Sequence, residues 1–236
     1  MTVDLLAIAA HCDDVEQTCG GALIRMAERG YRTGVLDVTA GEMGTRGDSE
    51  TRAREAEDAA REMLLAWRGN LGLPDARLEL SQDAKLAIAA KIRELRPRSV
   101  ILPYWEGRHP DHYRASQLGY EACFLAGLKK LDLPGEPHRP VKILYASLYA
   151  SVKPTFVVDI SAQFERRLRA LFCYRSQYED RPEGAQLFPS RDELADRIRS
   201  VARYYGMLIG VKYGEPYVVK EMIAVDDIVK MPVKSI

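Results

Sequence analysis

Short apolar runs alternate with longer segments of helical character through the first two thirds of the chain. The runs are rich in aliphatic and β-branched residues and have the length of strands. This alternation is typical of βα units that build a mainly parallel sheet. We therefore predict an α/β fold of the Rossmann-like, doubly wound type, with helices on both faces of the sheet. The expected strands are Leu5–Ala10, Val35–Thr39, Arg77–Leu80, Ser99–Pro103, Lys142–Leu148 and Phe156–Ile160.

The clearest helical segment is Glu50–Ala66, which is rich in Ala, Glu and Arg. A stretch of glycine and proline from Gly69 to Pro74 follows it and predicts a break in regular structure. Further helices are expected at Gly21–Arg29, Gln82–Leu95, His112–Leu131, Ala162–Tyr174 and Asp192–Tyr205.

The pattern changes after Ile209, where glycines and a proline interrupt the apolar residues of Val211–Val219. This sequence predicts an irregular C-terminal arm or an edge hairpin, because proline is confined to the edges of sheets. The segment Asp132–Pro140 predicts an exposed loop and could also mark a boundary. Since 236 residues suffice for one large α/β domain, we expect a single domain over residues 1–236.

Composition and charge narrow the class of protein. Hydrophobic residues make up 47% and charged residues 29%, as in ordinary globular proteins. Because 34 basic side chains balance 34 acidic ones, no overall field attracts nucleic acid or an anionic membrane, and we expect neither as a partner. No window approaches the roughly 18 apolar residues of a membrane span. The N-terminus does not resemble a signal peptide and the four cysteines have no CxxC spacing, so we expect a cytoplasmic protein with reduced thiols.

Titratable side chains are concentrated in two loops. The first strand leads at once into His11-Cys12-Asp13-Asp14-Val15-Glu16, and the fourth is soon followed by His109-Pro110-Asp111-His112. In a doubly wound sheet of strand order 3-2-1-4-5, strands 1 and 4 are neighbours, and ligands bind outside their carboxyl ends. We therefore expect both loops to face one cavity.

The two loops together supply a candidate metal site. His11, Asp14 and His112 provide the imidazoles and carboxylate that a catalytic divalent ion takes from the protein, with an open position left for water. Asp13 points elsewhere and can act as general base. His109, with Asp111 as an orienting partner, can donate to a developing oxyanion or leaving amine. Each motif alone could be a helix cap or a turn, but their pairing on adjacent strands favours the metal site.

These loops also resemble a known family. The stretches Ala10–Glu16 and His109–His112 are similar to the Ala-His-Pro-Asp-Asp-x-Glu and His-Pro-Asp-His signatures of the PIG-L/LmbE zinc-dependent N-acetylglucosaminyl deacetylases. The likeness includes Gly41–Gly47 and Tyr174–Gln177 and runs along nearly the whole chain. It implies one zinc ion per subunit, held by the three ligands named above, with Asp13 as general base and His109 as oxyanion stabiliser or acid.

The resemblance also suggests a substrate. The ending Leu208–Tyr217 and the Arg108-His109 junction look most like the bacillithiol-pathway branch, which deacetylates N-acetylglucosaminyl malate. The implied reaction is hydrolysis of the substrate's acetamide to acetate and a free amine. Plain N-acetylglucosamine, chitooligosaccharides and aminoglycosides are alternative acetylated substrates.

Cys12 departs from the family pattern, which has proline at this position. Loss of the ring frees φ and restores a backbone donor, so we expect a slightly more flexible loop with intact ligands. A competing hypothesis makes the Cys12 thiolate a zinc ligand.

Several polar residues are candidates for substrate contacts. The loop Gly41–Gly47 follows the second strand and should border the same crevice. We expect Glu42, Arg46 and Arg52 to contact the substrate, although the arginines could instead form exposed ion pairs.

A substrate that carries malate needs a basic partner. Arg108 is the better placed candidate for its carboxylates, with Lys212 as the second choice. Tyr174 and Gln177 could approach the sugar or simply pack in the core.

Two other classes of protein fit part of the pattern. Two histidines and a carboxylate also describe a non-haem iron oxygenase, which has no need for the extra carboxylate of Asp13. A metal-containing binding protein without catalysis would not need Asp13 and His109. The C-terminal arm and the family likeness predict a symmetric homo-oligomer, such as a trimer or hexamer.

Overall fold

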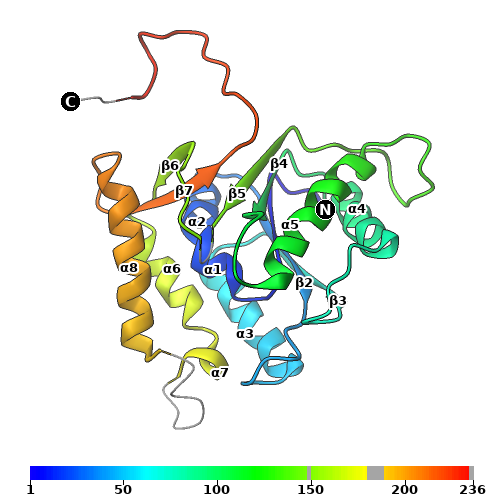
Figure 1. Ribbon diagram of the computed structural model, residues 1–236, viewed down its shortest axis with the longest axis horizontal. Coiled ribbons are helices and arrows are strands. Elements are labelled where there is room, and N and C mark those ends of the chain that lie inside the picture. Colours follow the sequence, from blue (N-terminus) through cyan, green and yellow to red (C-terminus); the bar gives the residue numbers. More distant parts are fainter. Residues whose placement is uncertain (148–149, 180–188, 234–236) are drawn as a thin grey trace.

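The protein is built around one seven-stranded sheet, seen in a computed structural model that describes residues 1–147, 150–179 and 189–233 (Figure 1). The strand order is β3-β2-β1-β4-β5-β7-β6. The first five strands are parallel, and β7 pairs antiparallel with both β5 and β6. The predicted doubly wound α/β fold is confirmed. The strands are β1 (Leu5–Ala9), β2 (Thr33–Thr39), β3 (Trp67–Leu73), β4 (Ser99–Pro103), β5 (Lys142–Ala146), β6 (Phe156–Asp159) and β7 (Gly214–Val218).

Helices cover both faces of this sheet (Figure 1). Strand β1 is buried on both sides, as parallel strands usually are. Its Leu6 and Ile8 pack with α4 and α5, whereas Ala7 and Ala9 face the core beneath α1 and α2. The helices are α1 (Asp14–Thr18), α2 (Gly20–Glu28), α3 (Ser49–Glu62), α4 (Gln82–Leu95), α5 (Pro110–Ala126), α6 (Phe164–Leu171), α7 (Arg175–Tyr178) and α8 (Arg191–Met207).

The third strand differs from its prediction. Residues Arg77–Leu80 form no strand, and β3 is Trp67–Leu73, within the stretch where the sequence predicts a break. β3 lies at the edge of the sheet, pairs only with β2 and is half-buried, so it lacks the apolar run of an inner strand. Gly72 adopts a positive φ of 64° at its end.

Other boundaries differ by a few residues. Helix α3 ends at Glu62 and α5 at Ala126, both earlier than expected, and α6 is shorter than its predicted range. The short helices α1 and α7 were not predicted. β5 ends at Ala146, and Leu148, the predicted end, lies outside the described residues.

The C-terminal region combines a strand with an arm. β7 lies between β5 and β6, so the prediction of an edge hairpin is wrong. Its Pro216 is opposite Val157 of β6 and lies beyond the end of the paired part of β5. Residues 219–233 then run away from the body as an irregular arm (Figure 1). Across the described chain, every helix is too short or too polar to cross a membrane.

The register of the central strands brings the two titratable loops together. β1 and β4 are parallel neighbours, with Leu5 opposite Ser99 and Ala7 opposite Ile101. Their carboxyl ends therefore lie at the same edge of the sheet, and the loops that follow them meet there.

Candidate active site

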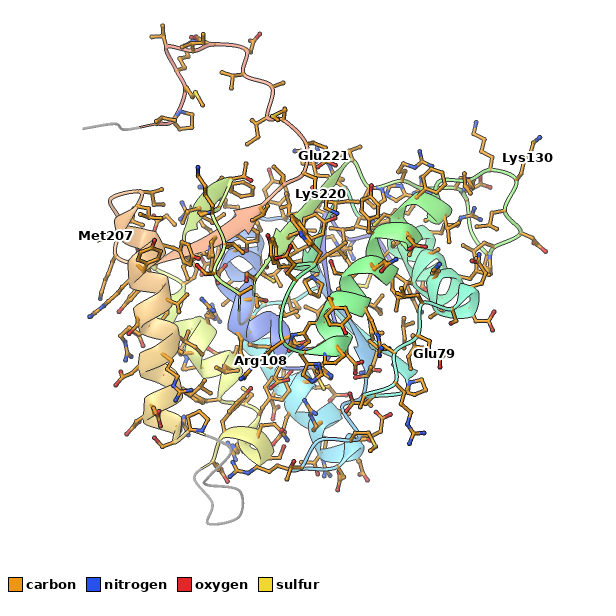
Figure 2. The ribbon with its side chains drawn as sticks, in the orientation of Figure 1. Glu79, Arg108, Lys130, Met207, Lys220 and Glu221 are labelled. Atoms are coloured by element: carbon orange, nitrogen blue, oxygen red, sulfur yellow. The ribbon has the colours of Figure 1, made fainter. Side chains whose placement is uncertain are left out.

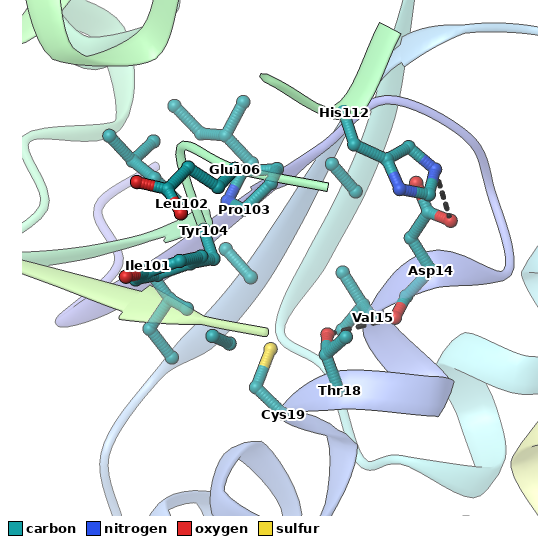
Figure 3. Close-up of a pocket in the computed structure, with 14 residues that line it drawn as sticks. Asp14, Val15, Thr18, Cys19, Ile101, Leu102, Pro103, Tyr104, Glu106 and His112 are labelled. Atoms are coloured by element: carbon teal, nitrogen blue, oxygen red, sulfur yellow. Dashed lines mark hydrogen bonds and ion pairs between the residues drawn. The ribbon is translucent and has the colours of Figure 1, made fainter. Parts of the chain in front are cut away.

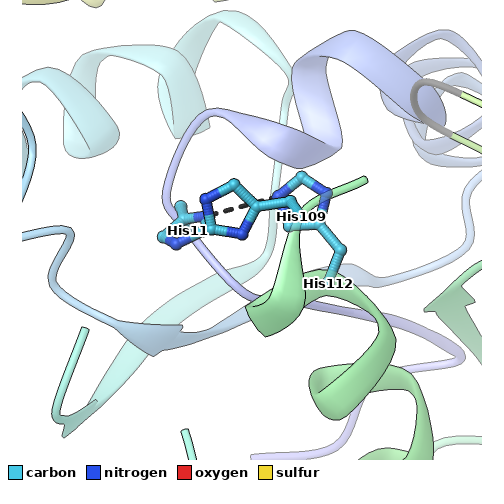
Figure 4. Close-up of side chains that lie close together, drawn as sticks. All are labelled: His11, His109 and His112. Atoms are coloured by element: carbon cyan, nitrogen blue, oxygen red, sulfur yellow. Dashed lines mark hydrogen bonds between the residues drawn. The ribbon is translucent and has the colours of Figure 1, made fainter. Parts of the chain in front are cut away.

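His11, Asp14 and His112 meet at the carboxyl ends of β1 and β4. Nδ1 of His11 lies 3.3 Å from Nε2 of His112 and 3.4 Å from Oδ2 of Asp14, while Oδ1 of Asp14 lies 3.2 Å from Nε2 of His112. Figure 3 shows Asp14 beside His112, and Figure 4 shows His11 against the other two histidine rings. A tetrahedral zinc ion holds its nitrogen and oxygen ligands about 3.3 Å apart. The three donors therefore fit one face of a zinc coordination sphere.

Local backbone structure explains why these donors converge. Asp14 is the first residue of α1, and its carboxylate accepts a hydrogen bond of 3.0 Å from the backbone N–H of His11. His112 lies in the first turn of α5, where Pro110 is well suited to start the helix. Two helix starts thus point their side chains into one space.

Asp75 supports His11 from behind. Its Oδ1 lies 3.0 Å from Nε2 of His11, the nitrogen that faces away from Asp14 and His112. Metal-binding histidines usually donate this second N–H to a carboxylate, which fixes the tautomer of the ring. The sequence prediction missed Asp75. The available signal was its position just after β3, at the same edge of the sheet as the other site residues.

Carboxylates make this site strongly favourable for positive charge. Burial lowers the pKa of His11, but Asp14, Asp111 and Asp75 together raise it to about 12. Burial raises the pKa of Asp14, yet His112 and His11 bring it well below its ordinary value. Burial likewise opposes ionisation of Asp75, and the hydrogen bond and charge of His11 lower its pKa. The same field favours a bound cation.

Asp13 faces a different set of partners from its neighbour Asp14. Its Oδ1 lies 3.1 Å from Nη2 of Arg52, and its Oδ2 accepts a hydrogen bond from the hydroxyl of Tyr178. Arg52 is only 5% exposed and also donates to the carbonyl of Gly41 at 2.9 Å. Arg52 thus forms a buried ion pair with Asp13. Among the described residues, the exposed ion pair that the sequence offered as the alternative role of Arg52 is not formed. Tyr178 was not predicted.

His109 packs against both histidines of the candidate metal site, stacked on His112 and edge-on to His11. Its ring lies 4.6 Å from that of His112 at an angle of 20°, and 4.8 Å from that of His11 (Figure 4). Nδ1 of His109 accepts a hydrogen bond of 3.3 Å from the backbone N–H of Asp111, so the neutral ring carries its proton on Nε2. Burial, followed by the charges of His112 and His11, lowers the pKa of His109. This ring is therefore suited to donate a hydrogen bond.

The carboxylate of Asp111 lies near His11, whereas the sequence predicts that it orients His109. The backbone of Asp111, not its carboxylate, contacts His109. The fully buried carboxylate accepts a hydrogen bond of 2.7 Å from the backbone of Ala76 and lies 3.7 Å from Nε2 of His11. Asp111 therefore joins Asp75 in supporting His11.

The predicted substrate residues lie around this centre with contacts of their own. Glu42 accepts a hydrogen bond of 2.7 Å from the backbone of Asp75, and Arg46 donates to the carbonyl of Gln177 at 3.1 Å. Arg108 is exposed in the loop between β4 and α5 (Figure 2). The substrate contacts of these residues and of Arg52 stay predictions.

Cys12 packs away from the candidate ligands. Its sulfur lies 3.9 Å from the carbonyl of Ala40, and the side chain belongs to a small cluster with Ala56, Ala59 and Tyr174. Burial raises the pKa of the Cys12 thiol to about 12. These contacts favour the ligand set of two histidines and one aspartate over a thiolate ligand.

A buried charge network holds the first loop in place. Arg68 on β3 lies 2.7 Å from Glu16 and 2.8 Å from Asp37, and it also donates to the carbonyl of Cys12. Tyr174 donates to the same carbonyl and lies 3.2 Å from Glu16. Tyr174 is fully buried and helps to hold this loop. This agrees with the expected packing role of Tyr174 in the core, the alternative to a contact with the sugar.

A narrow pocket borders Asp14 and His112 (Figure 3), and its cavity volume of about 20 Å³ is enough for about one water molecule. One wall comes from α1, with Val15 and Thr18, and from Cys19 just after it, and the opposite wall includes Tyr104 and Glu106. The floor consists of small and aliphatic residues of β1, β4 and β5. The candidate metal site therefore borders a narrow cavity that Tyr104 and Glu106 help to line.

Comparisons with known proteins agree with this geometry. Residues 6–123 match the family model described as GlcNAc-PI de-N-acetylase, PIG-L. The chain is 32% identical to a diacetylchitobiose deacetylase of Thermococcus kodakarensis, over 89% of this chain and 80% of the relative. It is 29% identical to a probable N-acetyl-α-D-glucosaminyl L-malate deacetylase of Bacillus cereus, over 74% and 84% of the two chains.

A solved structure extends the likeness to the whole fold. The crystal structure of a conserved protein from Thermus thermophilus superposes with a TM-score of 0.86 at 39% identity and covers 95% of this chain and 98% of that one. The matched residues 6–123 contain both titratable loops and all three candidate metal ligands. The chain belongs to the GlcNAc-PI de-N-acetylase (PIG-L) family, whose matched members include deacetylases of N-acetylated sugars.

Proposed function

We propose that this protein is a zinc-dependent N-deacetylase that hydrolyses the acetamide of an N-acetylglucosamine-type substrate and releases acetate and the free amine. The observation that carries the proposal is the convergence of His11, Asp14 and His112 within 3.2–3.4 Å of one another, beside a further carboxylate on Asp13. The site would take one zinc ion per subunit.

Each residue of the candidate site has its own role in the proposed hydrolysis. A bound zinc ion supplies a Lewis acid that polarises the amide carbonyl and acidifies water. Asp13, held by Arg52 and Tyr178, accepts the proton of the attacking water as general base. His109 donates a hydrogen bond from Nε2 to the oxyanion, since its Nδ1 is already an acceptor. The proton that Asp13 has accepted is then passed to the leaving amine. Asp75 and Asp111 keep His11 in the tautomer that leaves Nδ1 available.

The preferred substrate is N-acetylglucosaminyl malate, as in bacillithiol biosynthesis. The similarity to the Bacillus cereus malate deacetylase supports this choice, as does the exposed Arg108 one residue before His109. A chitooligosaccharide such as diacetylchitobiose is the alternative, because the Thermococcus relative is matched over more of this chain.

A panel of acetylated sugars tests the proposal. The zinc-loaded protein should release acetate from N-acetylglucosaminyl malate, with diacetylchitobiose and plain N-acetylglucosamine as comparisons. Chelation should abolish release and zinc should restore it. No acetate from any acetylated sugar would end the proposal, and oxygen consumption with ferrous iron would favour an oxygenase instead.

We also propose that the protein forms a homo-oligomer in the cytoplasm, such as a trimer or hexamer, and binds neither nucleic acid nor membrane. The arm of residues 219–233 supports this assembly because Met222, Ile228 and Val229 are each more than 80% exposed. Light scattering of the full chain should give an oligomer, and a chain that ends at Lys220 should dissociate. A full-length monomer would contradict the proposed assembly.

A further inference from the structure

The C-terminal arm is tied to the loop that carries His109 through one lysine. Lys220 lies two residues after the end of β7, at the start of the arm, and Figure 2 labels it there. Its Nζ lies 4.7 Å from the ring centre of Trp105, 4.8 Å from that of Tyr120 and 5.0 Å from that of Tyr145. We call this arrangement the aromatic clamp.

The three rings of the aromatic clamp come from three different elements. Trp105 lies in the β4–α5 loop, Tyr120 on α5 and Tyr145 on β5. Trp105 also packs edge-on against Tyr145, with ring centres 4.8 Å apart. An ammonium within about 6 Å of an aromatic ring is attracted to its negative face. Lys220 therefore holds the loop, the helix and the strand to one another.

Trp105 connects the aromatic clamp to the candidate active site. Its ring packs against that of Tyr104 at a tilt of 34°, with ring centres 4.2 Å apart, and its Nε1 donates a hydrogen bond of 3.2 Å to Glu106. Tyr104 and Glu106 form part of the wall of the pocket that borders Asp14 and His112. The position of Trp105 thus sets the position of this wall.

We propose that Lys220 is a positioning residue that fixes the substrate-facing wall through Trp105. The expected change in KM rests on the proposed function, whereas the expected change in the position of Trp105 does not. Lys220 contacts none of the candidate metal ligands in the described structure. Its loss should therefore weaken substrate binding and leave zinc binding unchanged.

Substitution of the lysine tests the proposal in the full-length, zinc-loaded protein. Lys220→Met keeps an apolar stem of similar length and removes the charge. We expect KM to rise roughly 2- to 5-fold, as the loss of a cation–π contact at an exposed lysine predicts, with kcat and zinc affinity little changed. Lys220→Arg should restore KM, because a guanidinium also binds aromatic faces. The matched control is Lys230→Met on the same arm, where Lys230 lies 3.3 Å from Asp227.

A second readout does not depend on activity. The chain has two tryptophans, so Trp67→Phe leaves Trp105 as the sole indole fluorophore. In that background, Lys220→Met should shift Trp105 emission to longer wavelength and raise its quenching by acrylamide, and Tyr120→Leu should produce a smaller change in the same direction. Unchanged fluorescence, or a KM effect that Lys230→Met reproduces, would overturn the clamp. If no sugar is hydrolysed, the proposed function fails while the fluorescence still decides this inference.

Discussion

Asp75 and His11 lie 64 residues apart in sequence and 3.0 Å apart in space, joined through Nε2 of the imidazole. The opposite ring nitrogen, Nδ1, faces Asp14 and His112. One ring nitrogen of this imidazole therefore contacts a carboxylate, and the other is left with a lone pair that could bind a metal ion. Asp75 contributes to the site although it holds no place among the three candidate ligands.

Asp75→Asn should weaken zinc binding by about 10- to 100-fold, as loss of a supporting partner of a metal-binding histidine typically does. The amide can present a donor to Nε2 instead of an acceptor, which disfavours the required tautomer. Competition titration with a chromophoric chelator measures the effect. Asp83→Asn, at an exposed position on α4, is the control, and equal zinc affinity in both variants would contradict the assigned role.

Asp13→Asn should lower kcat by about 10²- to 10⁴-fold because it removes the general base. Zinc should stay bound at normal affinity, since Asp13 is paired with Arg52 and Tyr178. Steady-state kinetics gives kcat, and metal analysis of the same preparation gives the zinc content. Full activity in this variant would count against hydrolysis by the proposed route.

Gly41→Ala should reduce turnover although residue 41 is not a candidate ligand. A Cβ at this position would lie 1.9 Å from Nη1 of Arg52, and Gly41 has a positive φ of 67°. Arg52 must then move and release Asp13. Gly30→Ala separates backbone strain from the clash with Arg52. Gly30 also has a positive φ, of 87°, but no atom lies within 4 Å of the added carbon. We expect a loss of stability in both variants and a loss of kcat only in Gly41→Ala.

Arg108→Ala should raise KM for N-acetylglucosaminyl malate far more than for plain N-acetylglucosamine. The guanidinium can bind the two malate carboxylates, which the plain sugar lacks. The ratio of the two KM values, measured in wild type and variant, isolates this interaction. A proportional change for both sugars would refute the anion role.

Arg68→Met should destabilise the fold by about 3–5 kcal/mol, since it leaves two buried carboxylates without their cation. Urea denaturation at pH 7 measures this loss, with the exposed Arg54→Met as control. Burial raises the pKa of Glu16 to about 7 and also raises that of Asp37, even with Arg68 in place. The folded variant should therefore bind more protons than the unfolded chain, so its stability should fall as pH rises from about 5 to 8. A destabilisation that is independent of pH would contradict this explanation.

The parts of the fold that rest on burial were predictable from sequence. β1 and β4 are short apolar runs between polar loops, and their adjacency follows from the order of a doubly wound sheet. The spacing of His11, Asp14 and His112 after those strands then indicated their convergence.

Features that depend on contacts between distant polar residues were not predictable. β3 carries Arg68 and Asn70, whose partners Asp37 and the carbonyl of Thr39 lie on β2, so its sequence shows no apolar run. Because β3 was predicted at the wrong residues, the position of Asp75 two residues after its end was not recognised. Tyr178 reaches Asp13 from 165 residues away, and no local pattern indicates such a pairing.

His11 and His112 are separated by 101 positions, yet their ring nitrogens are 3.3 Å apart. An ion shared by both would act as a cross-link that closes a loop of nearly half the chain. Such closure removes entropy from the unfolded ensemble, and the gain grows with the logarithm of loop length. The candidate metal site would then also stabilise the fold, so that the metal-bound protein unfolds at a higher temperature than the metal-free protein.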